Sequence, residues 1–562
     1  MLLPLVLLLA TLPAVAGGIA LMPLDDREGR GGPCGRPAVA GGIALMPLDD
    51  RPATGHFPQM IARIAGDQLL LPPRQTLGRY IEPGDGAKLV RWLEGLDAAS
   101  FDGLVVSVDM LAYGGLVASR LPLVSFEEAR KRLEALPALR RQHPRLKIYA
   151  FNCVMRLAPT GRPENRAWRR ALQRWASVVD EAEATANQKL RAEAAELRAQ
   201  IPEQEMRRYL EARRRNHAVN LRMIEWVSEG VLDFLALSQD DARPYGLHRP
   251  EQIQLRERVR QLGVGDRVMV FPGADELGMV LVARVETARR GLQPRVAADF
   301  SSEKGKELVD PYEDRPIRET VEAQIRASGG LPAASAQAAD LLLFVNVPQR
   351  TKQELEAFLG RLEKAVAEGR QVAVADVALL GKNGGPDPQL VAFLEQNHLL
   401  HRLAAFAGWN TTANTLGTVL PQAYAWLAAN QSRGRKGAEP GSRPEPFPHP
   451  GGCDIAQAEF LFHRYVNDYG YHVVLRPGLH AEIRKRGWDV EHLTEEQYAG
   501  INRQAQAGME RFARDFFRRY FQPLGYRLKN LRTYLPWPRP FEVVIEVEFA
   551  ADAQSSRRTR PR

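Results

Sequence analysis

The stretch "IALMPLDDRP" (residues 43–52) decides the fold, because six apolar residues stand in a row and two acids follow at once. A continuous apolar run, without polar alternation, is typical of a strand covered on both faces, as in a parallel sheet. Asp49, Asp50 and Arg51 come where that strand would end. The stretch therefore predicts a buried parallel strand with charged side chains at its carboxyl end.

Nine further apolar runs share this character, at residues 68–72, 103–110, 146–152, 232–238, 267–273, 295–301, 340–347, 371–377 and 403–408. Helical patterns separate them, so the sequence predicts an α/β fold of repeated βα units with parallel sheets. Five of the ten expected strands precede residue 265 and five follow it, which favours two doubly wound lobes. A (β/α)₈-like barrel needs eight strands and stays open as the alternative.

The domain organisation follows from breaks in this rhythm. We expect a first lobe at 41–264, a second lobe at 265–430, a Gly/Pro/Ser-rich linker at 431–453 and a small C-terminal α+β region at 454–550. The charged helical segment 163–231, punctuated by Pro202, is expected as an insertion in the first lobe. In the C-terminal region we expect helices at 454–469 and 495–521 and an alternating strand at 540–550.

The N-terminal segment reads as an export signal. Residues 1–16 hold an apolar run that ends in Ala14-Val15-Ala16, a small-residue cleavage site. This predicts export to the periplasm, the cell envelope or the medium. No Lys or Arg precedes the apolar run, so an uncleaved N-terminal anchor stays open as the alternative.

The sequence "PAVAGGIALMPLDDR" occurs twice, at residues 13–27 and 37–51. Only the second copy continues into "RPATGHFPQMIARIAG", a proline-led helix start, whereas the first continues into the loop-like "EGRGGPCGR". One sheet has one position for this strand. We therefore expect the second copy in the sheet and residues 17–40 as a mobile duplicated leader.

Charge and cysteine content exclude several classes of protein. The net charge is +9, but four arginines belong to the last eight residues, and 551–562 is expected as a disordered basic tail. No basic stripe with interleaved aromatic residues appears, so we expect no nucleic-acid partner. Three cysteines are too few for a disulfide-dense scaffold or a Cys₄ zinc site.

Acids are doubled at three expected strand ends. A single carboxylate is enough to cap a following helix, and a second adds repulsion unless something uses it. Capping remains the alternative for any one of them. The candidates for acid, base or metal ligand are Asp49, Asp50, Asp240, Asp241, Asp275 and Glu276.

Further polar and aromatic residues near the same strand ends are candidates for substrate contact. Arg51 and Arg156 could neutralise the acids or grip an anionic or polyhydroxyl ligand. Trp409 could stack on a sugar ring or belong to the core. The full set of expected contact residues is Arg51, Asp109, Tyr113, Arg156, Trp409 and Asn410.

Paired carboxylates, one protonated and one ionised, are what glycosidic hydrolysis requires. The sequence therefore predicts an exported hydrolase acting on a saccharide or other polar envelope-derived substrate. The same carboxylates could hold Mg²⁺, Mn²⁺ or Ca²⁺, so a divalent-metal-dependent hydrolase is an alternative, and a two-lobed binding protein for a small polar ligand is another. No HExxH, GxSxG, Walker or GxGxxG pattern appears where its chemistry would need it.

Five motifs stand in order along the chain: "MPLDDRPAT", "VSVDMLAYGGLVASR", "LALSQDDARPYG", "PGADELG" and "FAGWNTTANTLGT". With them the chain resembles the uncharacterised bacterial family known as domain of unknown function 4127, over about residues 40–550. The resemblance implies that the copy at residues 49–52 closes the opening strand of the family. It implies no chemistry, because the family has no assigned activity.

Overall fold

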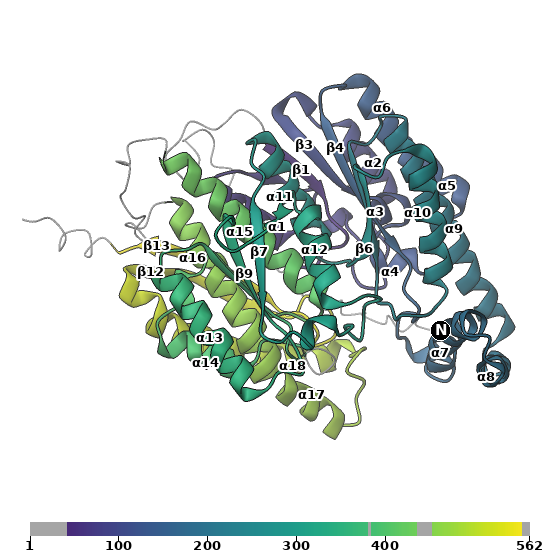
Figure 1. Cartoon of the computed structure of the whole chain (residues 1–562). Helices are drawn as coiled ribbons and strands as arrows, with labels where there is room; N and C mark the ends of the chain where they lie inside the picture. The colour runs from purple at the N-terminus through teal and green to yellow at the C-terminus, as the bar shows by residue number, and fades with distance from the viewer. Residues whose placement is uncertain (1–41, 380–383, 435–451, 553–562) are drawn as a thin grey trace, which may run out of the picture.

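The computed structural model describes residues 42–379, 384–434 and 452–552. Within these residues, the strands form a six-stranded and a five-stranded parallel sheet and one antiparallel hairpin (Figure 1). The predicted α/β class with parallel sheets is confirmed. The strands lie in two separate sheets and not in one barrel.

The first sheet has, from edge to edge, the strands β2 (Leu69–Leu70), β1 (Gly42–Met46), β3 (Phe101–Ser107), β4 (Lys147–Val154), β5 (Phe234–Gln239) and β6 (Val268–Pro272). Its helices are α1 (His56–Ala65), α2 (Gly86–Glu94), α3 (Val108–Tyr113), α4 (Leu116–Ser119), α5 (Phe126–Leu133), α6 (Ala135–Gln142), α9 (Glu203–Ser228), α10 (His248–Leu262) and α11 (Leu277–Arg289).

Both faces of the first sheet are buried. Leu45 on β1 packs in one core cluster with Leu281 of α11, while its neighbour Met46 packs in another with Trp226 of α9. Successive side chains of a strand point to opposite faces, so a strand covered on both sides needs apolar residues at every position. This is why the run at residues 43–48 shows no polar alternation.

The second sheet has the strands β8 (Leu331–Pro332), β7 (Arg295–Phe300), β9 (Leu341–Asn346), β10 (Val372–Asp376) and β11 (Ala405–Ala407). Its helices are α12 (Ile317–Ala327), α13 (Lys352–Ala367), α14 (Pro388–Gln396) and α15 (Thr412–Gly434). The spatial order β8-β7-β9-β10-β11 repeats the relative order of β2-β1-β3-β4-β5. Both sheets are thus doubly wound with one topology, which places ligands at the carboxyl ends of the strands.

Two details of the strand assignment differ from the sequence-based expectation. The run at 267–273 gives β6, which pairs with β5 (Leu235↔Val268) and belongs to the first sheet, so the expected division into five and five strands is wrong. Strand β8 was not predicted, because two residues are too few to make an apolar run. The division of the chain into domains at residue 264 stays a prediction.

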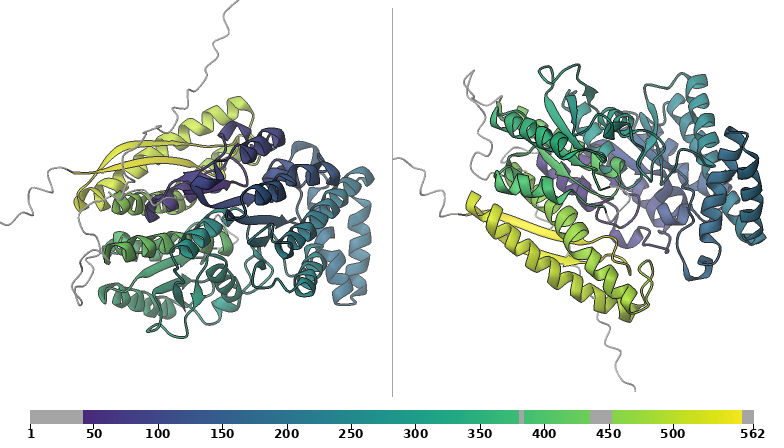
Figure 2. Two further views of the ribbon diagram at one scale, coloured as in Figure 1. Left: turned by 90° about the horizontal axis from the view of Figure 1, so that it is seen from above. Right: turned by 60° about the horizontal axis from the view of Figure 1, so that its bottom comes forward.

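The helical insertion follows β4 as expected. It consists of three helices, α7 (Arg169–Ala184), α8 (Gln188–Ala199) and α9, and not of a two-helix hairpin. Leu172, Ile201 and Met206 form a separate small core between them. The later part of α9 packs on the first sheet, so it also serves as the crossover from β4 to β5. Figures 1 and 2 show α7 and α8 at the opposite end of the molecule from the β12–β13 hairpin.

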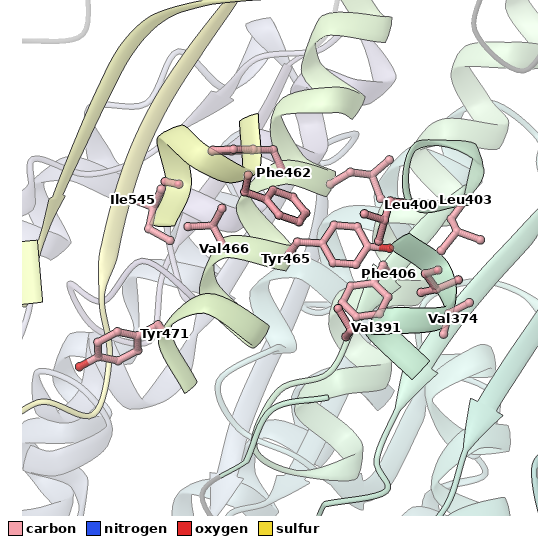
Figure 3. Packing of buried hydrophobic residues seen from close by; sticks show 14 of the residues in the cluster. Val374, Val391, Leu400, Leu403, Phe406, Phe462, Tyr465, Val466, Tyr471 and Ile545 are labelled. Carbon is pink, nitrogen blue, oxygen red and sulfur yellow. The ribbon is translucent and has the colours of Figure 1, made fainter. Parts of the chain in front are cut away.

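The C-terminal region contains α16 (Gly452–Arg464), a π-helix (Tyr465–Leu475), α17 (Arg476–Lys485), α18 (Glu495–Tyr520), β12 (Tyr526–Tyr534) and β13 (Val544–Ala551). It shares one core with the second sheet, as Figure 3 shows. There the ring of Tyr465 stacks on Phe406 of β11, with centroids 4.1 Å apart. The expected helices and final strand are present, while β12, the partner of that strand, was not predicted.

Short 3₁₀ helices complete the described secondary structure, at Arg74–Thr76, Ala98–Ser100, Pro163–Asn165, Gly305–Glu307, Leu400–Arg402 and Gln522–Leu524. None of the helices in the described part is long and apolar enough to span a bilayer.

The second copy of the duplicated sequence supplies β1, which pairs with β2 on one side and with β3 on the other. The expected signal peptide (1–16) and leader (17–40) lie outside the described residues. The same holds for residues 435–451 of the expected linker and 553–562 of the expected tail.

The two sheets are joined by helices that pack between them, chiefly α1 and α11 against α15. Gly417 of α15 faces Glu276, which immediately precedes α11. A Cβ atom at Gly417 would lie 2.1 Å from Glu276 Cγ, so the approach of the two helices here requires glycine.

We expect Gly417→Ala to lower the free energy of unfolding by about 1–3 kcal/mol, because the added methyl group overpacks this contact. Gly360→Ala on α13 is the matched control, since a Cβ there meets no atom within 4 Å. It should raise stability by about 0.5–1 kcal/mol, as usual for glycine in a helix interior. Thermal unfolding followed by circular dichroism compares the two. Equal stability of the two variants would contradict the close packing of α11 and α15.

Candidate functional site

The carboxyl ends of the first sheet open onto a cavity of about 530 Å³. Its wall includes segments that follow β1, β3, β4, β5 and β6, residues 311–313 and 410–414 from the connections of the second sheet, and residues 537–541 of the C-terminal region. The helical insertion adds Arg169 and Gln173. Both the size and the position at the strand ends are those of a small-molecule site.

Charged side chains dominate this wall. The lining arginines are Arg51, Arg120, Arg156, Arg169, Arg243, Arg476 and Arg539, and the lining carboxylates are Asp240, Asp241, Asp275, Glu313 and Glu491.

Arg51 is the centre of a buried ion cluster. Its Nη2 donates to Asp49 Oδ2 (2.7 Å) and to Asp275 Oδ1 (2.6 Å), and its Nη1 donates to Asp275 Oδ2 (2.9 Å). Glu542 from the C-terminal region accepts a longer bond of 3.4 Å. Burial alone would lower the pKa of Arg51, but Asp275, Asp49 and Glu542 together raise it well above its usual value. Arg51 therefore stays charged and joins three distant segments.

Asp49 belongs to this cluster and Asp50 is held separately, and neither residue lines the cavity. Asp49 is 3% exposed and is held by Arg51 and the Thr54 hydroxyl. Asp50 accepts from Trp537 Nε1 at 2.7 Å and from Arg74 at 3.3 Å, and burial raises its pKa. The doubled acids at the end of β1 are thus used to fix the C-terminal region.

Asp240 and Asp241 do face the cavity. Arg120 Nη2 donates to Asp240 Oδ2 at 2.6 Å, and Arg156 Nη1 donates to Asp241 Oδ2 at 3.0 Å. Desolvation within the cavity and the negative charge of Asp240 raise the pKa of Asp241, against the lowering effect of Arg156 and Arg120. The two neighbouring carboxyls also differ in their surroundings, since the side chain of Asp240 is buried against Arg120 whereas that of Asp241 is 40% exposed.

The third pair of acids is divided between the cavity and the protein interior. Asp275 lines the cavity, with both oxygens held by Arg51. Glu276 is fully buried below it, accepting from Ala274 N and from Gln324 Nε2, each at 2.9 Å. Burial raises the pKa of Glu276 to about 7. Its place against α15 makes Glu276 a packing residue.

The expected contact residues are also divided. Arg156 and Asn410 line the cavity, as Arg51 does. Asp109 is fully buried and accepts from Cys153 N at 2.8 Å, and burial raises its pKa to about 6. The other two, Tyr113 and Trp409, belong to hydrophobic core clusters and do not line the cavity.

Several lining residues were missed by the sequence analysis. Arg120 and Arg243 lie inside the motifs "VSVDMLAYGGLVASR" and "LALSQDDARPYG", so a search for cations near the acids could have found them. Glu313 caps α15 by accepting from Ala413 N at 2.7 Å. The C-terminal contributors Arg476 and Arg539 reach the cavity only through tertiary packing, which no local pattern signals.

The sequence analysis gave a divalent metal site, holding Mg²⁺, Mn²⁺ or Ca²⁺, as an alternative. Among residues 42–379, 384–434 and 452–552, no group of three or more His, Cys, Asp or Glu side chains is placed to hold a metal ion.

A family described as "Protein of unknown function (DUF4127)" matches residues 43–546. This match confirms the resemblance that the five motifs predicted. No curated protein matches the sequence.

We expect Arg51→Gln to destabilise the fold by about 3–5 kcal/mol, because it leaves buried carboxylates without their counterion. Without Arg51 the folded-state pKa of Asp275 rises further above its unfolded value. The destabilisation is therefore largest above the pKa that Asp275 has in the folded variant. It shrinks as the pH falls toward about 4, because Asp275 then takes up a proton in the folded protein with or without Arg51.

Thermal unfolding at several pH values measures this effect. Arg174→Gln is the control, since its ion pair with Glu193 is exposed and should contribute little. A small loss for Arg51→Gln, independent of pH, would show that the cluster does not hold the segments together.

Proposed function

The chain belongs to the DUF4127 family, and because that description assigns no activity, we propose a function from the cavity itself. The protein is a hydrolase that acts on a saccharide or a similar polar substrate. Asp240 and Asp241 are its catalytic carboxyl pair.

One observation carries this proposal: two adjacent carboxyls face one cavity in different electrostatic surroundings. Asp240 is 5% exposed, and its ion pair with Arg120 stabilises the negative charge. The raised pKa of Asp241 favours the protonated form. A protonated and an ionised carboxyl on one site are the requirement for acid–base cleavage of a glycosidic bond.

In the proposed reaction, the carboxyl proton of Asp241 moves to the leaving-group oxygen as the bond between carbon and that oxygen breaks. Asp240 accepts a proton from the water that attacks the carbon, or attacks it directly to form an intermediate that water then hydrolyses. Either route consumes one water molecule. In the first route Asp240 then releases its proton to solvent and Asp241 takes one up, and in the second route the hydrolysing water gives its proton to Asp241.

The rest of the cavity suits a polar substrate. Arginine side chains offer donors to hydroxyl groups, and the ring of Tyr312, 44% exposed, offers an apolar face. The cavity wall combines residues of both lobes, an arrangement that a binding protein for a small ligand would also use. Turnover separates these two functions. Export of the protein is also part of the proposal. It is argued from the sequence of residues 1–16, which lie outside the described residues.

We expect Asp241→Asn to lower kcat by about 10²–10⁴-fold, the usual effect of losing a general acid. Wild-type activity should fall as the pH rises through the raised pKa of Asp241. Release of reducing ends from aryl glycosides and cell-wall oligosaccharides, with and without chelator, provides the assay. Asp266→Asn is the control, since its side chain is 78% exposed.

Turnover that survives Asp241→Asn would refute the proposed acid. Ligand binding without turnover in the wild type would favour the binding protein, and loss of turnover with chelator would favour the metal-dependent hydrolase.

A further inference from the structure

We propose that the ligand of this cavity carries an anionic group, a carboxylate or a phosphate, which Arg243 and Arg476 bind beside Asp241. The inference deepens the proposed function by naming the substrate class, an acidic saccharide. The binding of the anion itself does not depend on hydrolysis.

The pairing of charges in the cavity singles out these two arginines. Five lining arginines have a carboxylate partner: Arg51 with Asp275, Arg120 with Asp240, Arg156 with Asp241, Arg169 with Glu491 and Arg539 with Glu542. Within the described residues, Arg243 and Arg476 form no ion pair, although both line the cavity. The cavity therefore holds two arginines without a salt-bridge partner among the described residues, Arg243 exposed and Arg476 buried.

Arg476, the first residue of α17, is 4% exposed. Its Nη1 donates to Phe541 O at 3.3 Å, and its Nε has no partner. Burial lowers the pKa of Arg476, and the more distant negative charge of Glu542 offsets this effect only in part. A buried guanidinium without a carboxylate is costly, and an anionic ligand group would offset that cost.

Arg243 follows Asp241 by two residues, in a turn tied to the second lobe by the bond from Ala242 N to Tyr312 O (2.7 Å). The charges of Asp241, Arg243 and Arg476 all act on the Tyr312 hydroxyl. Asp241, Tyr312 and both arginines line the same cavity, so a ligand in it can reach all four side chains. Two guanidiniums and a phenol hydroxyl supply donors enough for a carboxylate or a phosphate.

This placement also has a chemical consequence. An anionic group next to Asp241 disfavours ionisation of that carboxyl, because like charges repel. The substrate would then help to keep the proposed acid protonated. A neutral sugar of the same shape would give no such help and would leave the buried Arg476 without an ion-pair partner.

Isothermal titration calorimetry on the full chain tests the inference with three probes: glucuronate, glucose 6-phosphate and neutral glucose. We expect one of the two anionic probes to bind at least about tenfold more tightly than glucose, since charge-assisted hydrogen bonds are the strong ones. Which of the two binds identifies the anionic group as carboxylate or phosphate. Arg243→Gln should abolish that preference.

Arg476→Gln should have the same effect, but a buried arginine can also matter for folding. The exposed Arg243 keeps the test valid if the Arg476 variant does not fold. Arg174→Gln, on the surface of the insertion, is the control and should change nothing.

The inference is overturned if neither anion binds more tightly than glucose, or if Arg243→Gln leaves the preference intact. The proposed hydrolase can fail separately. Anion binding that depends on Arg243, with no turnover that depends on Asp241, would keep this inference and refute the hydrolase. Turnover of neutral saccharides without anion preference would refute this inference and support the hydrolase.

Discussion

The buried guanidinium of Arg51 is the interaction on which the cavity depends. It binds carboxylates that follow β1 and β6, namely Asp49 and Asp275, and it reaches Glu542 in the C-terminal region. A buried charge is tolerated only when its donors are satisfied, so these segments must meet around it. The meeting places the C-terminal region over the carboxyl edge of the first sheet. The carboxyl edge of the sheet thereby becomes one wall of a cavity.

The arrangement of the lobes adds to this enclosure. The two sheets have the same relative strand order, and the helices between them bring residues 311–313 and 410–414 to the edge of the first sheet. Glu313 shows how the two demands combine, since it caps α15 while lining the cavity. Polar residues from the connections of the second sheet therefore line the cavity at the carboxyl edge of the first sheet.

The sequence predicted what is local and periodic. Apolar runs located ten strands, because a strand buried on both faces leaves an unmistakable pattern. It also placed Asp240, Asp241 and Asp275 at one edge, where the structure has them. The sequence could not tell these acids from Asp49 and Asp50, because that distinction depends on Arg51 and Trp537.

The contribution of the C-terminal region to the cavity could not be predicted either, because it also depends on tertiary contacts. More than 400 residues separate Arg51 from Glu542, and their contact follows from packing that no local pattern records. Trp409 illustrates the opposite case: an aromatic residue at a strand end proved to be core. The residue type of Trp409 and its position after a strand fit a substrate contact and a core residue equally well.

Hydrogen–deuterium exchange of the full chain, with and without glucuronate or glucose 6-phosphate, tests most directly that this cavity binds the ligand. The account predicts that the bound anion slows exchange in the segments around residues 240–243, 311–313 and 476–480, which lie far apart in the sequence and together on the cavity wall. Slower exchange confined to other surfaces, such as the basic pocket formed by residues 511–528, or no change at all, would contradict it.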